Sequence, residues 1–183
     1  YENYNVTWSN ERCAELPIAR WHLAQTDGPV LEVGNVLGHY GPHSHTVIDK
    51  YETAPSVINA DITQWQTDRR FALIISISTF EHIGFDDDTD GNSGEKIQAA
   101  IAACRALLAP DGRLVITVPL GYNPALDELI ANETLGANET RFLLRHDRRD
   151  WREALRDKAI GTKYGEPFPY ANGLWVAQFL PAN

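Results

Sequence analysis

The sequence predicts an α/β protein built on an open, mostly parallel sheet with helices on its faces. Two patterns carry this prediction: short apolar runs typical of buried strands, and stretches between them whose apolar residues recur at helical spacing. The chain has 183 residues, a length that suits one domain with a real hydrophobic core. Its hydrophobic fraction of 43% and charged fraction of 22% are ordinary for a globular protein.

Seven segments are expected to form the strands of this sheet. The clearest is Phe71 to Ile77, which is rich in isoleucine, and Val30 to Val33 is a short apolar run followed directly by a glycine. In such sheets ligands bind outside the carboxyl ends of the strands, so the residues that follow each strand are the candidates for function. The other expected strands are residues 46–49, 57–61, 113–118, 142–144 and 174–179.

Three helices are expected between and before these strands. Residues 12–23 form one, and residues 95–108 form another, in which Asn92 and Glu95 resemble a capping box. Pro110-Asp111-Gly112 is expected to be the turn out of that helix, and a further helix is expected around residues 151–155. The connections after the first two strands are short, so the early crossover helices must be short or nearly absent.

The charge and hydropathy of the chain argue against nucleic-acid and membrane partners. The formal net charge of −9 disfavours a nucleic-acid substrate, and the basic residues between positions 141 and 158 are interleaved with acidic ones. No apolar run approaches the length of a membrane span, and no signal peptide is visible. We therefore expect a cytoplasmic protein without nucleic-acid or membrane partners, and its oligomeric state is not indicated.

Glycine and acidic residues stand at the ends of the first three expected strands. Gly34 and Gly38 permit a tight turn and the close approach of a ligand, although glycine is also ordinary turn chemistry there. Asp49 could accept hydrogen bonds from both hydroxyls of a ribose, and Asp61 could accept one from the exocyclic amine of a purine. Each also has a plainer interpretation, a solvated loop aspartate for Asp49 and an Asx-turn for Asp61.

The order of these residues is more specific than any one of them. Over roughly residues 28–120 the chain resembles the class I (Rossmann-like) S-adenosylmethionine-dependent methyltransferases, of the small bacterial type. The family's first loop usually has the pattern Gly-x-Gly-x-Gly, and here Val36 takes the place of the middle glycine. The motifs that carry the resemblance are, in order, Glu32-Val33-Gly34, Asp49, Asn59-Ala60-Asp61, Leu73 to Ile83 with its Ser-Thr-Phe-Glu-His-Ile end, and Leu107 to Pro119 with its Leu-Leu-Ala-Pro-Asp-Gly-Arg-Leu start.

This resemblance implies S-adenosylmethionine as the cofactor and S-adenosylhomocysteine as the product. Glu32 would organise the ammonium end of the cofactor, and the backbone around Gly34 would pack against its carboxypropyl part. Asp49 would bind the ribose, Asp61 with Ile62 would bind the adenine, and Ser76 to Ser78 would line the methionine end. The implied cofactor contacts are Glu32, Gly34, Asn35, Gly38, Asp49, Asp61, Ile62, Ser76 and Ser78.

The expected domain organisation follows from the same resemblance. Residues 1–183 would form a single methyltransferase-like domain. Within it, residues 1–27 would be an N-terminal cap segment and residues 28–120 the cofactor-binding half. Residues 121–183 would supply the substrate side and the last strands.

Candidate catalytic residues follow the fourth and fifth expected strands. Methyl transfer from a sulfonium mainly requires alignment of the two partners, but an alcohol or phenol acceptor also needs a base. His82 is the first candidate because imidazole titrates near neutral pH, and Glu81 is the second. His82 could equally serve only to orient the following turn. Tyr122 and Asn123 could line an acceptor pocket or simply form a turn.

We therefore expect a methyltransferase that methylates oxygen or nitrogen on a small molecule or a glycan. One alternative is a degenerate domain that binds the cofactor, or a partner, without transferring a methyl group. Another is a nicotinamide-dependent oxidoreductase, against which the acid before the first glycine argues, since that class has a Gly-x-Gly-x-x-Gly run.

No metal site is expected. The acidic loop at residues 86–91 matches the first half of a calcium-binding loop, but its twelfth position, normally glutamate, is Ile97. A solvated acidic loop is favoured over a site for a divalent cation. His39, His43 and His45 cluster in the sequence, but no further zinc ligand is evident nearby.

Overall fold

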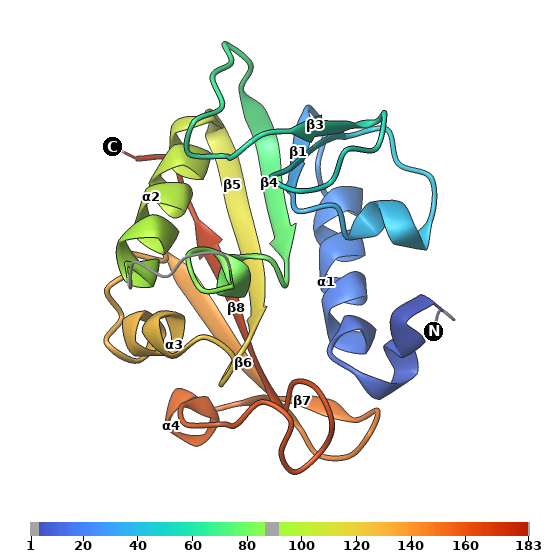
Figure 1. Cartoon of the computed structure of the whole chain (residues 1–183), viewed down its shortest axis with the longest axis vertical. Coiled ribbons are helices and arrows are strands. Elements are labelled where there is room, and N and C mark those ends of the chain that lie inside the picture. The colour runs from blue at the N-terminus through green and yellow to red at the C-terminus, as the bar shows by residue number, and fades with distance from the viewer. Residues whose placement is uncertain (1–3, 87–91, 183) are drawn as a thin grey trace.

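The computed structural model describes residues 4–86 and 92–182, and its strands form one eight-stranded sheet with helices on both faces (Figure 1). The strand order is β3-β2-β1-β4-β5-β8-β6-β7. Pairs from β3 through β5 are parallel, whereas β8 runs antiparallel to both of its neighbours and β7 antiparallel to β6. The strands are Val30–Val33 (β1), Thr46–Asp49 (β2), Val57–Asn59 (β3), Phe71–Ile77 (β4), Leu108–Pro119 (β5), Glu139–Arg145 (β6), Trp151–Ala154 (β7) and Gly173–Phe179 (β8).

Helices cover the two faces unequally. Helix α1 (Arg12–Ala24) packs on one face, while α2 (Ser93–Ala106) and α3 (Pro124–Ala131) pack on the other (Figure 1). The short α4 (Arg156–Ala159) lies beyond the carboxyl end of β5, at the bottom of that view. The remaining helical turns are the 3₁₀ segments Tyr4–Ser9 (η1), Leu37–Tyr40 (η2) and Phe80–His82 (η3).

The central strand β4 is buried on both faces of the sheet, which explains its continuous apolar sequence. Leu73, Ile75 and Ile77 pack beneath α1, whereas Ile74 belongs to the larger core under α2. Such alternation is what a strand between two helical layers requires. The expected α/β architecture is therefore confirmed, with one strand more than the seven predicted.

The early crossovers are as short as expected. Only η2 lies between β1 and β2, and the described residues between β2 and β4 contain no helix. The loops that follow β1, β2 and β3 therefore run directly along the carboxyl edge of the sheet. Within the residues that the structure describes, no helix has the length and apolar character needed to cross a membrane.

The helix predicted around residues 151–155 is wrong, because Trp151–Ala154 forms β7 and pairs with β6. The cause is the turn before it. The Asp147 carboxylate accepts hydrogen bonds from the backbone N–H groups of Arg149 (2.8 Å) and Asp150 (2.9 Å), which folds the chain back beside β6. Sheet pairing here overrides the helical propensity of the segment.

Two further local predictions are wrong. Asn92 and Glu95 do not form a capping box, because the Asn92 amide donates to the Glu95 carboxylate (2.5 Å) and no side chain caps α2. Pro110-Asp111-Gly112 is not a turn but an irregular part of β5, where the register with β4 shifts. A Cβ atom on Gly112 would lie 2.5 Å from the carbonyl oxygen of Phe71, so glycine allows the two strands to stay close.

Candidate functional site

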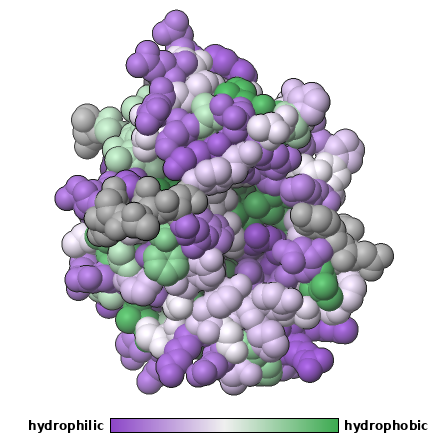
Figure 2. Space-filling model, in the orientation of Figure 1, coloured by the Kyte–Doolittle hydropathy of each residue, from purple (hydrophilic) through white to green (hydrophobic). Residues whose placement is uncertain are grey.

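A cavity of about 630 Å³ opens at the carboxyl ends of the first four strands. Figure 2 shows this face of the molecule hollowed near its centre, where apolar and polar surfaces meet. The predicted site residues Gly34, Asn35, Asp49, Asp61, Ile62, Ser78 and His82 line the cavity. Six others lie outside its lining, namely Glu32, Gly38, Ser76, Glu81, Tyr122 and Asn123.

The loop after β1 touches the turn after β4 through Gly34. This glycine has a φ angle of +85°, and a Cβ atom there would lie 2.1 Å from the Thr79 hydroxyl oxygen. A larger residue would therefore meet both backbone strain and a collision. The second predicted glycine, Gly38, serves the same loop, because a Cβ atom there would lie 2.3 Å from the Asn35 side-chain oxygen.

Glu32 lies beneath this loop and is fully buried. Its Oε1 accepts hydrogen bonds from the backbone N–H groups of Val36 (2.9 Å) and Leu37 (2.7 Å). Its Oε2 lies 2.7 Å from His45 Nε2, so both carboxylate oxygens are engaged within the protein. The structure thus places Glu32 where it shapes the backbone that lines the cavity.

Asp49, at the end of β2, organises the neighbouring loop. Its Oδ1 accepts from the N–H groups of Tyr51 (2.8 Å) and Glu52 (2.9 Å), and its Oδ2 accepts from Asn35 N–H (3.2 Å). The Asn35 amide donates in turn to Glu52 Oε1 (2.8 Å), whereas Asn35 Oδ1 is buried without a partner among the described residues. This edge of the cavity therefore carries the Asp49 carboxylate, with the unpartnered Asn35 oxygen buried behind the surface.

Asp61 lines the cavity one strand further along. Its Oδ1 accepts from both the N–H (2.9 Å) and the hydroxyl (2.7 Å) of Thr63, and Lys50 Nζ lies 3.8 Å from Oδ2. Burial by itself would raise the pKa of Asp61, but these contacts hold it below its ordinary value. The carboxylate remains ionised and available as an acceptor beside Ile62.

The two predicted serines of β4 and its turn have different surroundings. The Ser76 hydroxyl donates to the carbonyl of Val33 (2.8 Å) and ties β4 to β1, away from the cavity. Ser78 lines the cavity and has a φ angle of +39°. Its hydroxyl donates to Glu15 Oε1 (2.8 Å), which also accepts from Thr117 (2.8 Å). The turn after β4 is thereby anchored to α1.

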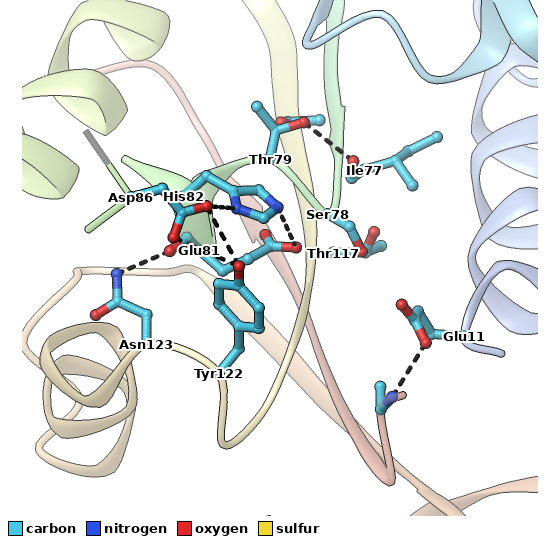
Figure 3. Close-up of polar contacts among 12 residues, drawn as sticks. Glu11, Ile77, Ser78, Thr79, Glu81, His82, Asp86, Thr117, Tyr122 and Asn123 are labelled. Carbon is cyan, nitrogen blue, oxygen red and sulfur yellow. Dashed lines mark hydrogen bonds and ion pairs between the residues drawn. The ribbon is translucent and has the colours of Figure 1, made fainter. Parts of the chain in front are cut away.

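His82 connects the cavity to a group of aromatic and acidic side chains (Figure 3). Its Nδ1 lies 2.5 Å from Asp86 Oδ2, and the hydroxyl of Tyr122 donates to the same oxygen (3.2 Å). The ring of Tyr122 packs edge-on against both His82, at 5.0 Å between centroids, and Tyr164, at 5.2 Å. Tyr122 thus belongs to this group of side chains and does not line the cavity.

Asn123 links the segment that contains Glu81 to the start of α3. Its amide donates to the carbonyl of Glu81 (2.9 Å), and its Oδ1 caps α3 by accepting from the N–H groups of Ala125 (3.0 Å) and Leu126 (3.3 Å). The side chain is buried, so the structure gives Asn123 a structural position.

Glu81 is buried, with 2% of its surface exposed. Its Oε1 lies 3.7 Å from His82 Nε2, and its Oε2 has no hydrogen-bond partner among the described residues. Burial, followed by the nearby carboxylate of Glu15, raises the pKa of Glu81 well above its ordinary value. Figure 3 shows its carboxyl group directed between His82 and Thr117.

Sequence reasoning missed the acidic residues that α1 brings to this region. Glu15 is fully buried and forms an ion pair with Arg12, and Glu11 accepts a hydrogen bond from Ala171 N–H (3.1 Å). A signal was present, because Glu15 stands on the apolar stripe of the helix beside Leu16. Tyr164 carried no comparable signal, since it lies in an irregular segment.

The structure describes the histidines of one candidate metal site and only the start of the other. Residues 87–91 of the acidic loop lie outside the described residues, so the match to a calcium loop is not described. Among the described residues, no group of three or more His, Cys, Asp or Glu side chains could hold a metal ion. The ring centroids of His43 and His45 lie 4.5 Å apart with the planes tilted by 31°, and His45 is the partner of Glu32.

Comparisons with known proteins identify structures that share this fold. No family model matches the sequence, and no curated protein is similar to it. The structure resembles the N-methyltransferase NodS from Bradyrhizobium japonicum WM9 in complex with S-adenosyl-L-homocysteine, with 17% identity, 94% of this chain and 88% of that chain covered, and a TM-score of 0.56. A second NodS structure covers 97% and 99% of the two chains at 17% identity and a TM-score of 0.53.

A third similar structure is a TehB-like S-adenosylmethionine-dependent methyltransferase from Corynebacterium glutamicum ATCC 13032 Kitasato. It is 18% identical, covers 94% of this chain and 95% of that one, and has a TM-score of 0.51. At these identities the likeness concerns the fold. The chain therefore has the Rossmann-like fold of the class I S-adenosylmethionine-dependent methyltransferases, as the resemblance in its sequence predicted.

Proposed function

We propose that this chain is an S-adenosylmethionine-dependent methyltransferase that methylates nitrogen or oxygen on a small-molecule or glycan acceptor. The observation that carries the proposal is the cavity at the carboxyl ends of β1, β2, β3 and β4, the edge at which this fold class binds its ligands. Its position agrees with that of the sequence motifs, because Gly34, Asp49 and Asp61 all line it.

The residues of the cavity fit an adenosine-bearing cofactor. The carboxylate of Asp49, which lines the cavity, offers an acceptor to ribose hydroxyls or to an ammonium group. Asp61 with Ile62 offers one acceptor and one apolar surface to an adenine. The close contact of Gly34 with Thr79 keeps the loop backbone at the cavity wall, so a ligand can lie against it.

S-adenosylmethionine would supply an electrophilic methyl group carried by a sulfonium. The chain's own contribution is to hold that group beside Ser78 and His82 and to align an acceptor with it. The acceptor would lie against the side chains beyond the cavity, from η3, Tyr122 and Tyr164. In this proposal residues 28–120 form the cofactor-binding half and residues 121–183 the substrate side of one domain.

A transfer assay tests this function. The protein is incubated with S-adenosylmethionine carrying a labelled methyl group and a panel of small amines, alcohols, phenols and sugars, and release of S-adenosylhomocysteine is measured. We expect acceptor-dependent release from at least one class. Binding of S-adenosylhomocysteine without transfer to any class would instead favour a domain that binds the cofactor without catalysis. Binding of NAD in place of both sulfur nucleotides would favour an oxidoreductase.

A further inference from the structure

Three buried glutamates meet where α1 faces the turn after β4: Glu11 directly before α1, Glu15 within α1, and Glu81 in η3. We call these three residues the acid cluster. Arg12 forms an ion pair with Glu15, and Glu11 accepts a backbone hydrogen bond from Ala171. Among the described residues, no lysine or arginine forms an ion pair with Glu81. The acid cluster therefore holds more carboxyl groups than cations.

Glu81 is the member of the acid cluster with an unpartnered carboxyl oxygen, Oε2. With a side chain exposed to only 3% and Oε2 unbonded among the described residues, it lacks the hydrogen bonds that buried carboxylates normally make. Leaving a charged group in this condition costs stability, so the sequence would be expected to avoid it without a functional reason. A ligand that donates an N–H to Oε2 would supply the missing partner.

The position of Glu81 is suited to a methyl acceptor. Its neighbour His82 and the nearby Ser78 both line the cavity at the ends of β1 to β4. The acid cluster therefore lies behind that part of the cavity wall. The ring of Tyr122 packs against His82 and against Tyr164, and both tyrosines lie near enough to Glu81 for its charge to act on them. An acceptor held against the ring of Tyr122 would lie beside both His82 and Glu81 (Figure 3).

We propose that the acceptor is an amine, that it enters as an ammonium ion, and that Glu81 receives its proton. This inference rests on the proposed methyltransferase function and names its substrate class. An ammonium ion supplies both the positive charge and the N–H donor that the acid cluster lacks, whereas an alcohol supplies only a weak donor and no charge. Carboxylates at this point would also disfavour an anionic acceptor.

The proposed step balances in protons and electrons. A proton passes from the ammonium nitrogen to Glu81, which frees the nitrogen lone pair. That lone pair forms the new N–C bond with the methyl group while the C–S bond breaks and its electron pair stays on sulfur. The products are a methylated ammonium ion, which keeps the positive charge, and a neutral thioether.

His82 provides the route by which the proton leaves Glu81. Its Nε2 lies 3.7 Å from Glu81 Oε1, and with a proton on Nδ1 it donates to Asp86 and can accept at Nε2. Asp86 would stabilise the imidazolium that forms, and His82 is exposed, so the proton can pass to solvent. The charged and titratable groups that face Glu81 are Glu11 before α1, Arg12 and Glu15 from α1, His82 from η3, and Tyr122 and Tyr164.

A binding experiment on the protein loaded with S-adenosylhomocysteine tests this inference without requiring turnover. Tryptophan fluorescence follows titration with two matched pairs, benzylamine against benzyl alcohol and glucosamine against glucose. We expect the amine of at least one pair to bind about tenfold or more tightly than its alcohol, the scale of one charge-assisted contact. In Glu81→Gln we expect that preference to fall by a similar factor, while affinity for S-adenosylhomocysteine stays within about twofold.

The outcomes separate this inference from the function on which it rests. Amines that bind no better than alcohols, or do not bind at all, overturn the amine assignment while binding of S-adenosylhomocysteine leaves the methyltransferase standing. Failure of the unsubstituted protein to bind S-adenosylhomocysteine overturns the methyltransferase itself. An unchanged amine preference in Glu81→Gln, or a large loss of S-adenosylhomocysteine affinity in it, removes the role given to Glu81.

Two further variants keep the proposal testable if Glu81→Gln does not fold. Glu81→Asp keeps the charge, so we expect it to retain an amine preference that Glu81→Gln loses. Glu11→Gln keeps its contact with Ala171 N–H but removes one carboxylate from the acid cluster, so amine binding should weaken by about two- to fivefold while alcohol binding is unchanged. Equal effects of Glu11→Gln on amines and alcohols would contradict the electrostatic basis of the proposal.

Discussion

Glu32 and Glu81 are two buried glutamates on neighbouring parts of the sheet edge, one in β1 and one after β4, and their surroundings are opposite. The carboxylate of Glu32 has three partners, two backbone N–H groups and His45. In Glu81, by contrast, Oε2 has no hydrogen-bond partner among the described residues, and Oε1 lies 3.7 Å from His82 Nε2. Burial alone thus does not distinguish a structural acid from a chemical one, but the hydrogen-bond partners do.

Removing Glu32 is the strongest test of that contrast. In Glu32→Ala the N–H groups of Val36 and Leu37 lose their acceptor, and His45 loses its partner. We expect the free energy of unfolding to fall by about 2–6 kcal/mol, because two backbone donors lose their acceptor at a cost of about 1–3 kcal/mol each. Urea denaturation measures this, and Glu128→Ala on the exposed face of α3 serves as the control with little change. A loss as small as that control would show that Glu32 does not hold the loop.

The contact between the two regions can be broken at Gly34. In Gly34→Ala the new Cβ atom meets Thr79 in a backbone conformation with positive φ, so we expect a loss of about 1–3 kcal/mol in stability. Because this loop lines the cavity, affinity for S-adenosylhomocysteine should fall by about tenfold or more. Gly94→Ala is the matched control, since its nearest neighbour would be 3.7 Å away. Equal affinities in the two variants would contradict the role of the loop in binding.

The parts of the molecule that could be predicted from sequence are those with local signals. The first four strands follow short apolar runs, and Gly34, Asp49 and Asp61 stand at their ends, so the cofactor side was visible in the motifs. The N-terminal acids were not, because their meeting with Glu81 depends on how α1 packs against β4. Strand β7 was missed because a turn at Asp147 and pairing with β6 outweigh a sequence with helical character.

The pH dependence of stability sharpens the description of Glu81. The folded-state pKa of this carboxyl lies above its ordinary value of 4.5, so the folded protein binds more protons than the unfolded chain as the pH rises from that value to the folded pKa. Its contribution therefore lowers the free energy of unfolding as the pH increases through this window. We expect Glu81→Gln to abolish that decrease and to be more stable by about 1–3 kcal/mol near neutral pH. Urea denaturation across a pH series measures both, and a parallel pH profile in the two proteins would contradict the unpaired state of Glu81.

A smaller effect is expected at Asp49, which combines both kinds of role. Asp49→Asn keeps a side-chain oxygen to accept from the N–H groups of Tyr51 and Glu52, so the loop should persist with a stability loss of about 1 kcal/mol or less. Loss of the charge should weaken S-adenosylhomocysteine binding by about tenfold. Asp68→Asn, an exposed position outside the cavity, is the control. Unchanged affinity in Asp49→Asn would remove Asp49 from the proposed ribose site.

Calorimetric titration of the unsubstituted protein with S-adenosylhomocysteine tests the proposed cofactor site most directly. The cavity at the ends of β1 to β4 predicts binding of one nucleotide per chain, weakened in Gly34→Ala and Asp49→Asn and retained in Gly94→Ala. Titration with NAD under the same conditions should give no comparable signal. No binding of S-adenosylhomocysteine, or binding that both cavity substitutions leave unchanged, would contradict the proposed site.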